Sequence, residues 1–294
     1  MPIFCYYLNY MEKEIIAYQH IRGVSFTQED ESPTKFPPHW HNDAEFVLIL
    51  KKGCKFRVDG KVFEPEEGDI LLIWPRELHE IIRIPQNGMA FIQFSSYLIE
   101  SNSDFAAASH FINGCHLISK KENAALTAKI EQLIYKIRDM HDKKQYFTET
   151  RCKVVVYEIL LTVGDFVMKE HRESLANVNF SDRLWEYVRY ACSYIAEHSA
   201  ENITQSEVAQ KTGLSQYYFS KLFNEYTKMS FPEYLAGIRV QKAIYLLENE
   251  SLSVTDCGFE AGFQSTTTFN KIFHGRTGCS PREYRKFLSQ NKKM

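Results

Sequence analysis

The chain has 294 residues, of which 44% are hydrophobic and 24% are charged, and its formal net charge is −2. This composition is ordinary for a folded globular protein and excludes disordered and collagen-like chains, while the length favours two domains. Charge is unevenly distributed, because the segment 211–294 contains 12 Lys and Arg residues against 7 Asp and Glu. A basic C-terminal end on an acidic body is typical of a module that faces phosphate groups.

Cysteine usage and the apolar runs exclude several protein classes. The seven cysteines are scattered and none forms a C-x-x-C pair, which argues against a disulfide framework and against a zinc finger. Reduced, mostly buried thiols are the simpler interpretation. No basic segment followed by a long apolar run opens the chain, and no run approaches 18 apolar residues. We therefore expect neither a signal peptide nor a membrane span.

Residues 1 to about 100 are predicted to form an antiparallel sandwich or barrel of short strands. Asp59-Gly60 lies between two apolar runs and is a strong signal for a hairpin. Continuous apolar runs such as Phe46–Leu50 and Ile70–Trp74 indicate buried strands. The expected strands are 46–50, 56–58, 62–63, 70–74, 81–84 and 89–94.

The next segment changes to a helical period. Leu126, Ile130, Leu133 and Ile137 recur at spacings of four, three and four, which places them on one face of a helix. A second helix is expected to begin near Thr148. This stripe either packs on the β domain or faces a partner chain, and its spacing, like that of a coiled coil, leads us to expect dimerisation.

From Ser181 onward the sequence predicts short helices separated by tight turns. Three capping boxes have a Ser or Thr followed three residues later by a Glu. They are Thr204 with Glu207, Ser230 with Glu233, and Ser280 with Glu283. Residues 173–180, which precede this region, have no period and are expected to be the linker between domains.

The second half of this region repeats the first half. Many residues recur unchanged at an offset of 50. Among them are Phe219, Lys221, Phe223, Thr227, Ser230, Glu233 and Tyr234, matched by Phe269, Lys271, Phe273, Thr277, Ser280, Glu283 and Tyr284. Upstream, Ala209 and Gly213 match Gly258 and Gly262 at an offset of 49, so the single-residue difference falls in a turn. The pattern predicts two copies of one supersecondary unit.

Each copy has the pattern of a helix-turn-helix. A short helix leads to Gly213 or Gly262, and Ser215 or Ser265 then caps a second helix. Small residues at Ala209 and Gly258 allow the two helices of each unit to cross closely. In such a motif the second helix enters the major groove of DNA.

These motifs resemble the AraC/XylS family of bacterial regulators over roughly residues 185–288. The resemblance is carried by residues 213–223, 230–235, 262–263, 269–273 and 277–281, and by Arg239, Ala243, Leu246, Leu247, Tyr284 and Arg285. Two positions depart from the family. Lys228 stands where glycine is usual, which requires a non-glycine residue in the left-handed region. Cys257 and Gly258 replace the usual Ile-Ala.

The resemblance implies two three-helix subdomains joined by a long helix over Phe231–Asn249. It places the recognition helices at about Gln216–Tyr226 and Thr266–His274, with their phenylalanines facing the core. The expected DNA-contact residues are Gln216, Tyr217, Ser220, Lys221, Arg239, Thr266, Thr267, Asn270 and Lys271. Amide side chains can bind adenine, lysine can reach guanine or phosphate, and a threonine methyl can contact thymine.

The N-terminal half resembles a cupin. His39-Trp40-His41 is followed by Glu45 and later by His79, and in metal-binding cupins such residues converge on one ion. The spacing departs from the metal-binding pattern, so we expect His39, His41, Glu45 and His79 to line an effector pocket with no metal. The aromatic residues Trp40, Phe46, Trp74 and Phe91 are expected in the core.

Together these observations predict an α+β protein that is a transcription regulator, activator or repressor, and not an enzyme. The expected domains are a cupin-like sensor (1–118), a dimerising helical pair (119–172), the linker, and an all-α double helix-turn-helix (181–294). Expected partners are double-stranded DNA, a small-molecule effector such as a sugar, a second copy of the chain and RNA polymerase, with no membrane and no cofactor. The expected location is the bacterial cytoplasm, at the nucleoid when the protein is bound to DNA.

Two rival interpretations are compatible with the same residues. One is a cupin metalloenzyme with an accessory DNA-binding domain. The other is an architectural DNA-binding module whose sensor domain has lost its ligand.

Overall fold

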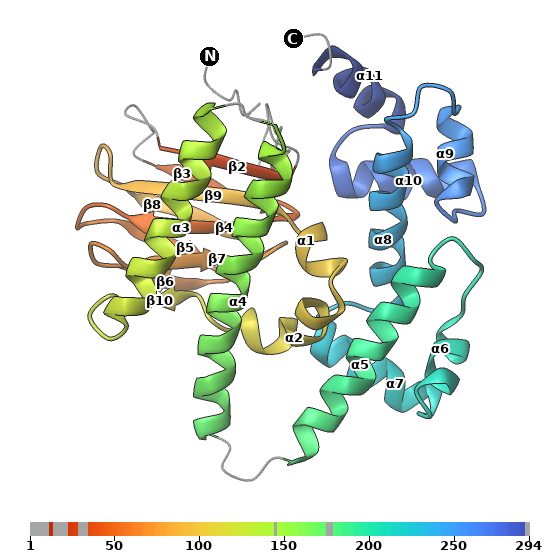
Figure 1. The fold of residues 1–294 in the computed structure, drawn as a ribbon, viewed down its shortest axis with the longest axis horizontal. Helices are drawn as coiled ribbons and strands as arrows, with labels where there is room; N and C mark the ends of the chain where they lie inside the picture. Colours follow the sequence, from red (N-terminus) through yellow and green to blue (C-terminus); the bar gives the residue numbers. More distant parts are fainter. Residues whose placement is uncertain (1–11, 14–22, 29–34, 144–145, 175–178, 292–294) are drawn as a thin grey trace. The chain divides into compact units, whose positions relative to one another are not determined.

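The computed structural model describes residues 12–13, 23–28, 35–143, 146–174 and 179–291. The chain forms two compact units (Figure 1). The barrel unit comprises the residues up to Ser96 together with Asn113–Val167, and the helical unit comprises Tyr97–Ile112 together with the residues from Met168 onward. In the part of the chain that is described, no helix has the length and apolar character needed to cross a membrane.

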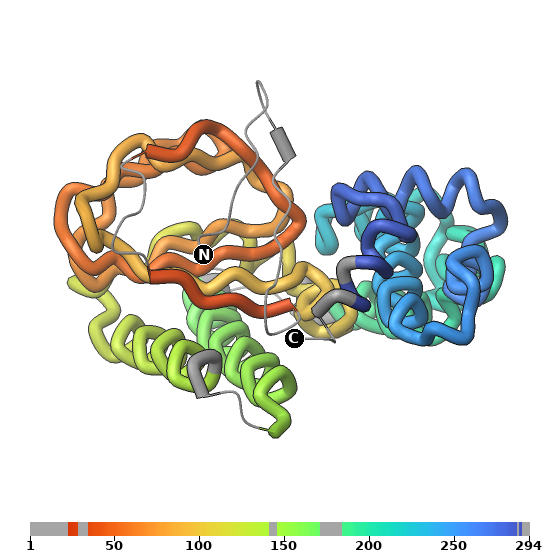
Figure 2. Tube along the Cα trace, turned by 90° about the horizontal axis from the view of Figure 1, so that it is seen from above, coloured from red at the N-terminus to blue at the C-terminus, as the bar shows by residue number. Residues whose placement is uncertain are grey.

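The barrel unit contains two five-stranded sheets, with strand orders β1-β3-β8-β5-β6 and β10-β7-β4-β9-β2. The strands are β1 (Glu12–Lys13), β2 (Val24–Thr27), β3 (Phe36–Trp40), β4 (Asp43–Ile49), β5 (Lys55–Val58), β6 (Lys61–Phe63), β7 (Ile70–Ile73), β8 (His79–Arg83), β9 (Met89–Ser95) and β10 (Leu117–Ile118). The pairings are antiparallel except that of β1 with β3. Both sheets contribute to one buried cluster, in which Val47 and Leu71 of one sheet join Phe56 and Val58 of the other, so the sheets pack face to face (Figure 2).

The expected strands are confirmed, and so is the hairpin at Asp59-Gly60. Val58 pairs with Lys61, and both turn residues have positive φ, 47° for Asp59 and 79° for Gly60. Two left-handed residues in a two-residue loop match the twist of the flanking strands, and Asp and Gly adopt that conformation most readily. The expected core aromatics Phe46 and Trp74 are fully buried, whereas Trp40 and Phe91 are partly exposed.

Two long helices, α3 (Ala124–Lys143) and α4 (Thr148–Ser174), follow the strands and cover the outer face of the β7-β4-β9 sheet (Figures 1 and 2). Phe46 and Leu48, which alternate with the inward-facing Val47, are buried on that outer face. The stripe on α3 is also internal, because Ile130 and Ile137 are 0% exposed within a single chain. The expectation that this stripe faces a second subunit is therefore wrong. Side chains alternate between the two faces of the sheet, and here both faces are apolar. The outer face must therefore be buried against other elements, and α3 and α4 bury it.

Residues 97–112 form two helices, α1 (Tyr97–Glu100) and α2 (Ser103–Ile112), that belong to the helical unit. Ala106 and Ala107 of α2 are buried in one cluster with residues of α5 (Asn179–His198) and α7 (Gln216–Thr227). We expected one continuous domain over 1–118, and the structure instead divides this stretch between the two units. Four of the eight expected linker residues, 175–178, lie outside the described residues.

The remaining helices reproduce the internal repeat. They are α6 (Gln205–Lys211), α8 (Phe231–Leu246), α9 (Val254–Glu260), α10 (Thr266–Thr277) and α11 (Pro281–Asn291). Helices α7 and α10 start and end 50 residues apart, and α6 and α9 start and end 49 residues apart. The inserted residue therefore lies in the turn between helices, as the sequence predicts. The connecting helix α8 ends at Leu246, earlier than the expected Asn249, whose side chain instead accepts a hydrogen bond from the Ser251 amide at 3.0 Å.

Close packing explains the small residue at Gly258. A Cβ atom at this position would lie 2.6 Å from the Phe269 ring, so α9 and α10 approach more closely than a larger residue allows. The turn that follows has Gly262 at φ 103°, and its counterpart Gly213 has φ 72°. Both turns use a left-handed residue that favours glycine.

Lys228 ends α7 in the left-handed region at φ 58°, where its repeat counterpart Gly278 has φ 78°. The expected non-glycine left-handed residue is thus confirmed. A Cβ atom is disfavoured in this region, so Lys228→Gly should raise the free energy of unfolding by about 0.5–1 kcal/mol. The matched change Gly278→Ala should lower it by about 1–2 kcal/mol. Urea titration followed by circular dichroism measures both changes, and a destabilised Lys228→Gly protein would contradict the assignment.

Candidate DNA-binding surface and buried histidine cluster

Helix α7 separates a buried face from an exposed face. Phe219, Leu222 and Phe223 are buried in the helical core. The Ser215 hydroxyl caps the helix by accepting a hydrogen bond from the Tyr218 amide at 3.3 Å. All four residues expected to contact DNA are exposed, and they are Gln216, Tyr217, Ser220 and Lys221.

Helix α10 presents the same arrangement. Phe269 and Phe273 are buried, and the Ser265 hydroxyl accepts a hydrogen bond from the Thr268 amide at 3.2 Å. The four expected contact residues are exposed, and they are Thr266, Thr267, Asn270 and Lys271. Each stands 50 positions after one of the four on α7, so the two helices display equivalent surface positions. Their hydroxyl, amide and ammonium groups are suited to hydrogen bonding with base edges and phosphates.

Arg239 differs from the rest of the expected contact set. Its Nε donates to the Ser199 carbonyl oxygen at 2.8 Å, and its Nη2 donates to the Glu201 carbonyl oxygen at 2.8 Å. Burial also lowers the pKa of its guanidinium. Arg239 therefore binds the end of α5 and the loop that follows it, and we remove it from the DNA-contact set.

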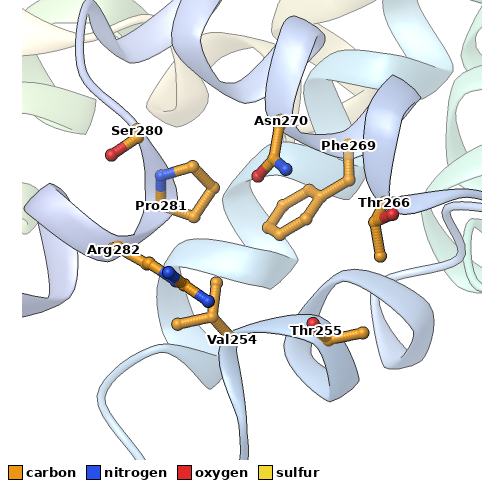
Figure 3. A pocket seen from close by; sticks show the side chains of 8 residues that line it. All are labelled: Val254, Thr255, Thr266, Phe269, Asn270, Ser280, Pro281 and Arg282. Atoms are coloured by element: carbon orange, nitrogen blue, oxygen red, sulfur yellow. The ribbon is translucent and has the colours of Figure 1, made fainter.

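A pocket of about 520 Å³ lies beside α10 (Figure 3). It is lined by Val254 and Thr255 of α9, Thr266, Phe269 and Asn270 of α10, and Ser280, Pro281 and Arg282 at the start of α11. The exposed guanidinium of Arg282 and the amino-terminal end of α11 both favour an anion there. Arg282 is not among the DNA-contact residues predicted from the sequence. Its position directly after the expected start of α11 was the available signal.

In the barrel unit the four expected effector residues converge. His39 on β3 pairs with His79 on β8, and their ring centroids are 4.1 Å apart. His41 follows β3, and its ring centroid is 4.8 Å from that of His79. Glu45 on β4 places Oε2 3.5 Å from His41 Nε2. Both sheets therefore contribute to one buried polar cluster.

Backbone carbonyl groups hold all three imidazole rings. The Nδ1 atom lies 2.9 Å from the Pro37 carbonyl oxygen in His39, from the Asp43 oxygen in His41, and from the Glu77 oxygen in His79. Burial, reinforced by His39, lowers the pKa of His79 to about 3. His79 is therefore neutral at neutral pH.

Glu45 and Gln93 complete the cluster from the second sheet. Burial acts to raise the pKa of Glu45, but its close approach to His41 and its electrostatic interactions with the three histidines outweigh it, so the pKa is lowered. Gln93 on β9 lies opposite Glu45 in the sheet and donates from Nε2 to Glu45 Oε2 at 3.2 Å. Gln93 is not among the residues predicted from the sequence, because only the pairing of β4 with β9 brings it next to Glu45.

Comparison with known families finds two matches in chain order. Residues 23–150 match the AraC-like ligand binding domain, and residues 208–286 match a helix-turn-helix domain. Together these matches cover strands β2 to β10, helices α7 to α10, and parts of α6 and α11.

Similar proteins include regulators of the same type. The HTH-type transcriptional regulator YdeC of Bacillus subtilis (strain 168) is 24% identical over 260 residues, which cover 86% of this chain and 87% of that protein. The HTH-type transcriptional regulator SAS0078 of Staphylococcus aureus (strain MSSA476) is 26% identical over 242 residues. That match covers 81% of this chain but 31% of the relative, so the chain spans about a third of its length.

Among solved structures, the C-terminal domain of AraT, a response regulator from Geobacillus stearothermophilus, is 30% identical. The match covers 34% of this chain and 84% of that chain, with a TM-score of 0.33.

Proposed function

The chain belongs to the AraC-type family of DNA-binding transcriptional regulators, and from this premise we propose that it reads its operator with α7 and α10 together. The observation that carries the proposal is the duplicated exposed face. Gln216, Tyr217, Ser220 and Lys221 recur in position as Thr266, Thr267, Asn270 and Lys271, all of them exposed. The two sets have different side chains at every equivalent position except the lysine, so each helix recognises a different short DNA sequence.

The connecting helix sets the spacing of the two readers. With 16 residues, α8 is about 24 Å long at about 1.5 Å per residue. Successive major grooves on one face of B-DNA lie about 34 Å apart. Half a subdomain at each end of α8 supplies the difference, and because a helix is stiff, the DNA bends to fit at an elastic cost of about a few kcal/mol.

A phosphate group of the DNA backbone is proposed to occupy the pocket beside α10. Arg282 places a positive charge in the pocket that Thr266 and Asn270 also line. A phosphate on the strand flanking the groove would receive a charge-assisted hydrogen bond there. Such a contact fixes the register of α10 on the duplex without adding sequence preference.

A small-molecule effector in the barrel unit is proposed to control this binding. The buried polar cluster around Glu45 and His79 offers hydrogen-bonding groups inside a largely apolar barrel, which is the usual make-up of a small-molecule site. A polyhydroxylated molecule such as a sugar matches these groups. Strand β9 carries Gln93 and continues through Ser96 into α1, so the chain itself links the cluster to a segment of the helical unit.

The same proposal extends to the protein's mode of action, its location and its effect on transcription. The protein acts by binding, without a catalytic residue, in the bacterial cytoplasm and at the nucleoid when bound to DNA. Contact with RNA polymerase would make it an activator, and occlusion of a promoter would make it a repressor.

A second copy of the chain is proposed to bind along α4. The inward face of α4 is buried, whereas Val154 and Leu161 are 59% and 56% exposed, with Tyr157 half-buried between them. The spacing of three and then four residues is that of a coiled-coil seam. Pairing with the same helix of a second copy would bury this stripe, in place of the α3 stripe that the barrel unit already buries.

Lysine replacement tests DNA reading. Lys221→Ala and Lys271→Ala should each weaken operator binding, because each removes one cation from a reading helix. Loss of a phosphate contact should affect all sequences and lower the salt slope by about one, whereas loss of a base contact should relax one position at about 1–3 kcal/mol. Footprinting and binding at several salt concentrations distinguish these outcomes.

Lys129→Ala, on the exposed side of α3, is the matched control and should leave binding unchanged. Footprints should cover two grooves on one face of the DNA, centred about ten base pairs apart. Protection of a single groove that is insensitive to changes at Thr266–Lys271 would show that the second repeat is structural.

Charged substitutions test the proposed dimer. Val154→Glu combined with Leu161→Glu should give a folded monomer with weaker operator binding, because the seam is removed without opening the core. Light scattering measures the mass, and Lys129→Glu with Gln132→Glu is the exposed control pair on α3. Ile130→Glu with Ile137→Glu should instead unfold the barrel unit, because both side chains are fully buried. A Val154/Leu161 variant that stays dimeric would locate the interface elsewhere.

A further inference from the structure

We propose that His39, His41 and His79 bind a divalent first-row transition metal, best matched by Zn²⁺, inside the barrel unit. This replaces the expectation of a metal-free pocket. The proposal concerns the barrel unit alone and stands independently of how the chain reads DNA. Among the described residues, these three form the one group of three or more His, Cys, Asp or Glu side chains with the geometry to hold a metal ion.

The first observation is convergence. One nitrogen from each histidine lies within 4.8 Å of the other two, and the three residues are 8%, 1% and 4% exposed. Ligand atoms around tetrahedral zinc, at bond lengths of about 2.0–2.1 Å, lie about 3.4 Å apart. The nitrogens therefore need to approach one another by at most about 1.4 Å to reach that geometry.

The second observation is the protonation pattern of the rings. A carbonyl oxygen can only accept a hydrogen bond, so each Nδ1 that faces a carbonyl oxygen at 2.9 Å carries the proton. In a neutral imidazole this leaves the Nε2 lone pair as the ligand atom. Histidines that bind metals are held in the same way, with the other ring nitrogen donating to a carbonyl or carboxylate group.

The third observation is the condition of His79. Its Nε2 is buried and has no hydrogen-bond partner among the described residues. Leaving a buried acceptor without a partner costs about 1–3 kcal/mol, and a barrel interior built only for packing would place an apolar residue there. A metal ion supplies the missing partner.

Glu45 supplies the compensating charge. Its Oε2 lies 3.5 Å from His41 Nε2, so with the His41 proton on Nδ1 two acceptor atoms face each other. A cation between them interacts favourably with both. Gln93 donates to the same carboxylate oxygen at 3.2 Å and orients it. Three imidazoles with a carboxylate beside them suit zinc in a four-coordinate site, whose last position is filled by Glu45 or by an oxygen atom of a bound small molecule.

Metal titration of the full-length chain tests the proposal. The protein is stripped with a chelator, dialysed and titrated with Zn²⁺ and, as a spectroscopic probe, with Co²⁺. We expect one ion per chain, visible Co²⁺ absorption of a four-coordinate nitrogen site, and a rise of several degrees in Tm with Zn²⁺. His79→Gln should reduce the affinity at least about 100-fold and abolish the shift in Tm.

His198→Gln is the matched control, because this exposed histidine lies in the helical unit and pairs with Glu201; it should bind metal as the parent chain does. Circular dichroism confirms that each variant is folded, and His39→Gln provides a second test if His79→Gln does not fold. The proposal is overturned if the stripped chain takes up neither ion, or if the folded His79→Gln or His39→Gln protein binds both as well as the parent does. Operator binding is measured separately on the same samples, so a failure of the DNA proposal is distinguishable.

Discussion

The buried residue Glu100 attaches the segment 97–112 to the rest of the helical unit. The backbone oxygen of Glu100 accepts a hydrogen bond from the Tyr234 hydroxyl at 2.5 Å, and the Glu100 carboxylate pairs with Arg276 Nη1 at 3.2 Å. A Cβ atom at Gly237 would lie 2.6 Å from that guanidinium and 2.8 Å from the carboxylate, so a larger residue there would displace the ends of these two side chains from their present positions. Removing one partner of a fully buried pair typically costs about 3–5 kcal/mol, and the partial exposure of Arg276 reduces the loss here.

The apolar contacts of α2 extend this attachment. Phe111 packs edge-on against Tyr226 of α7, with ring centroids 5.6 Å apart, and Ala106 and Ala107 complete the cluster around α5 and α7. Helix α2 therefore packs against α7, the first proposed recognition helix. The second, α10, contacts α1 through the ion pair between Arg276 and Glu100. Because α1 follows β9 directly in the chain, a change in the barrel strands has a covalent route to both reading helices.

Local signals account for what the sequence predicts well. Capping residues, turn glycines and the 50-residue repeat locate the first residues of α7 and α10, because these features depend on neighbours within a few positions, whereas α10 extends three residues beyond its predicted end. The exposed faces follow from helical spacing alone. The convergence of His39, His41 and His79 was also predictable as a group, whereas Gln93 required the register of β4 against β9.

Long-range packing accounts for what the sequence does not predict. The α3 stripe has the same spacing whether it packs on a sheet or on a partner chain. Only the apolar outer face of the β10-β7-β4-β9-β2 sheet, where α3 lies against β2, decides between the two. Arg239 lies at a motif position, but the loop carbonyls that bind it are about 40 residues away in the chain. The helical tendency of 103–112 is readable from its alanines, yet its partners on α5 and α7 lie far along the sequence.

Native-state hydrogen exchange tests most directly whether α2 is part of the helical unit. Phe223→Leu should lower the stability of that unit by about 1 kcal/mol, because Phe223 is fully buried in its core. We predict that the amides of α2 lose protection together with those of α5 and α7, while β4 and β9 keep theirs, since cooperative units open together. If α2 keeps its protection and follows β9 instead, the segment belongs to the barrel unit and the proposed route from the barrel to the reading helices is wrong.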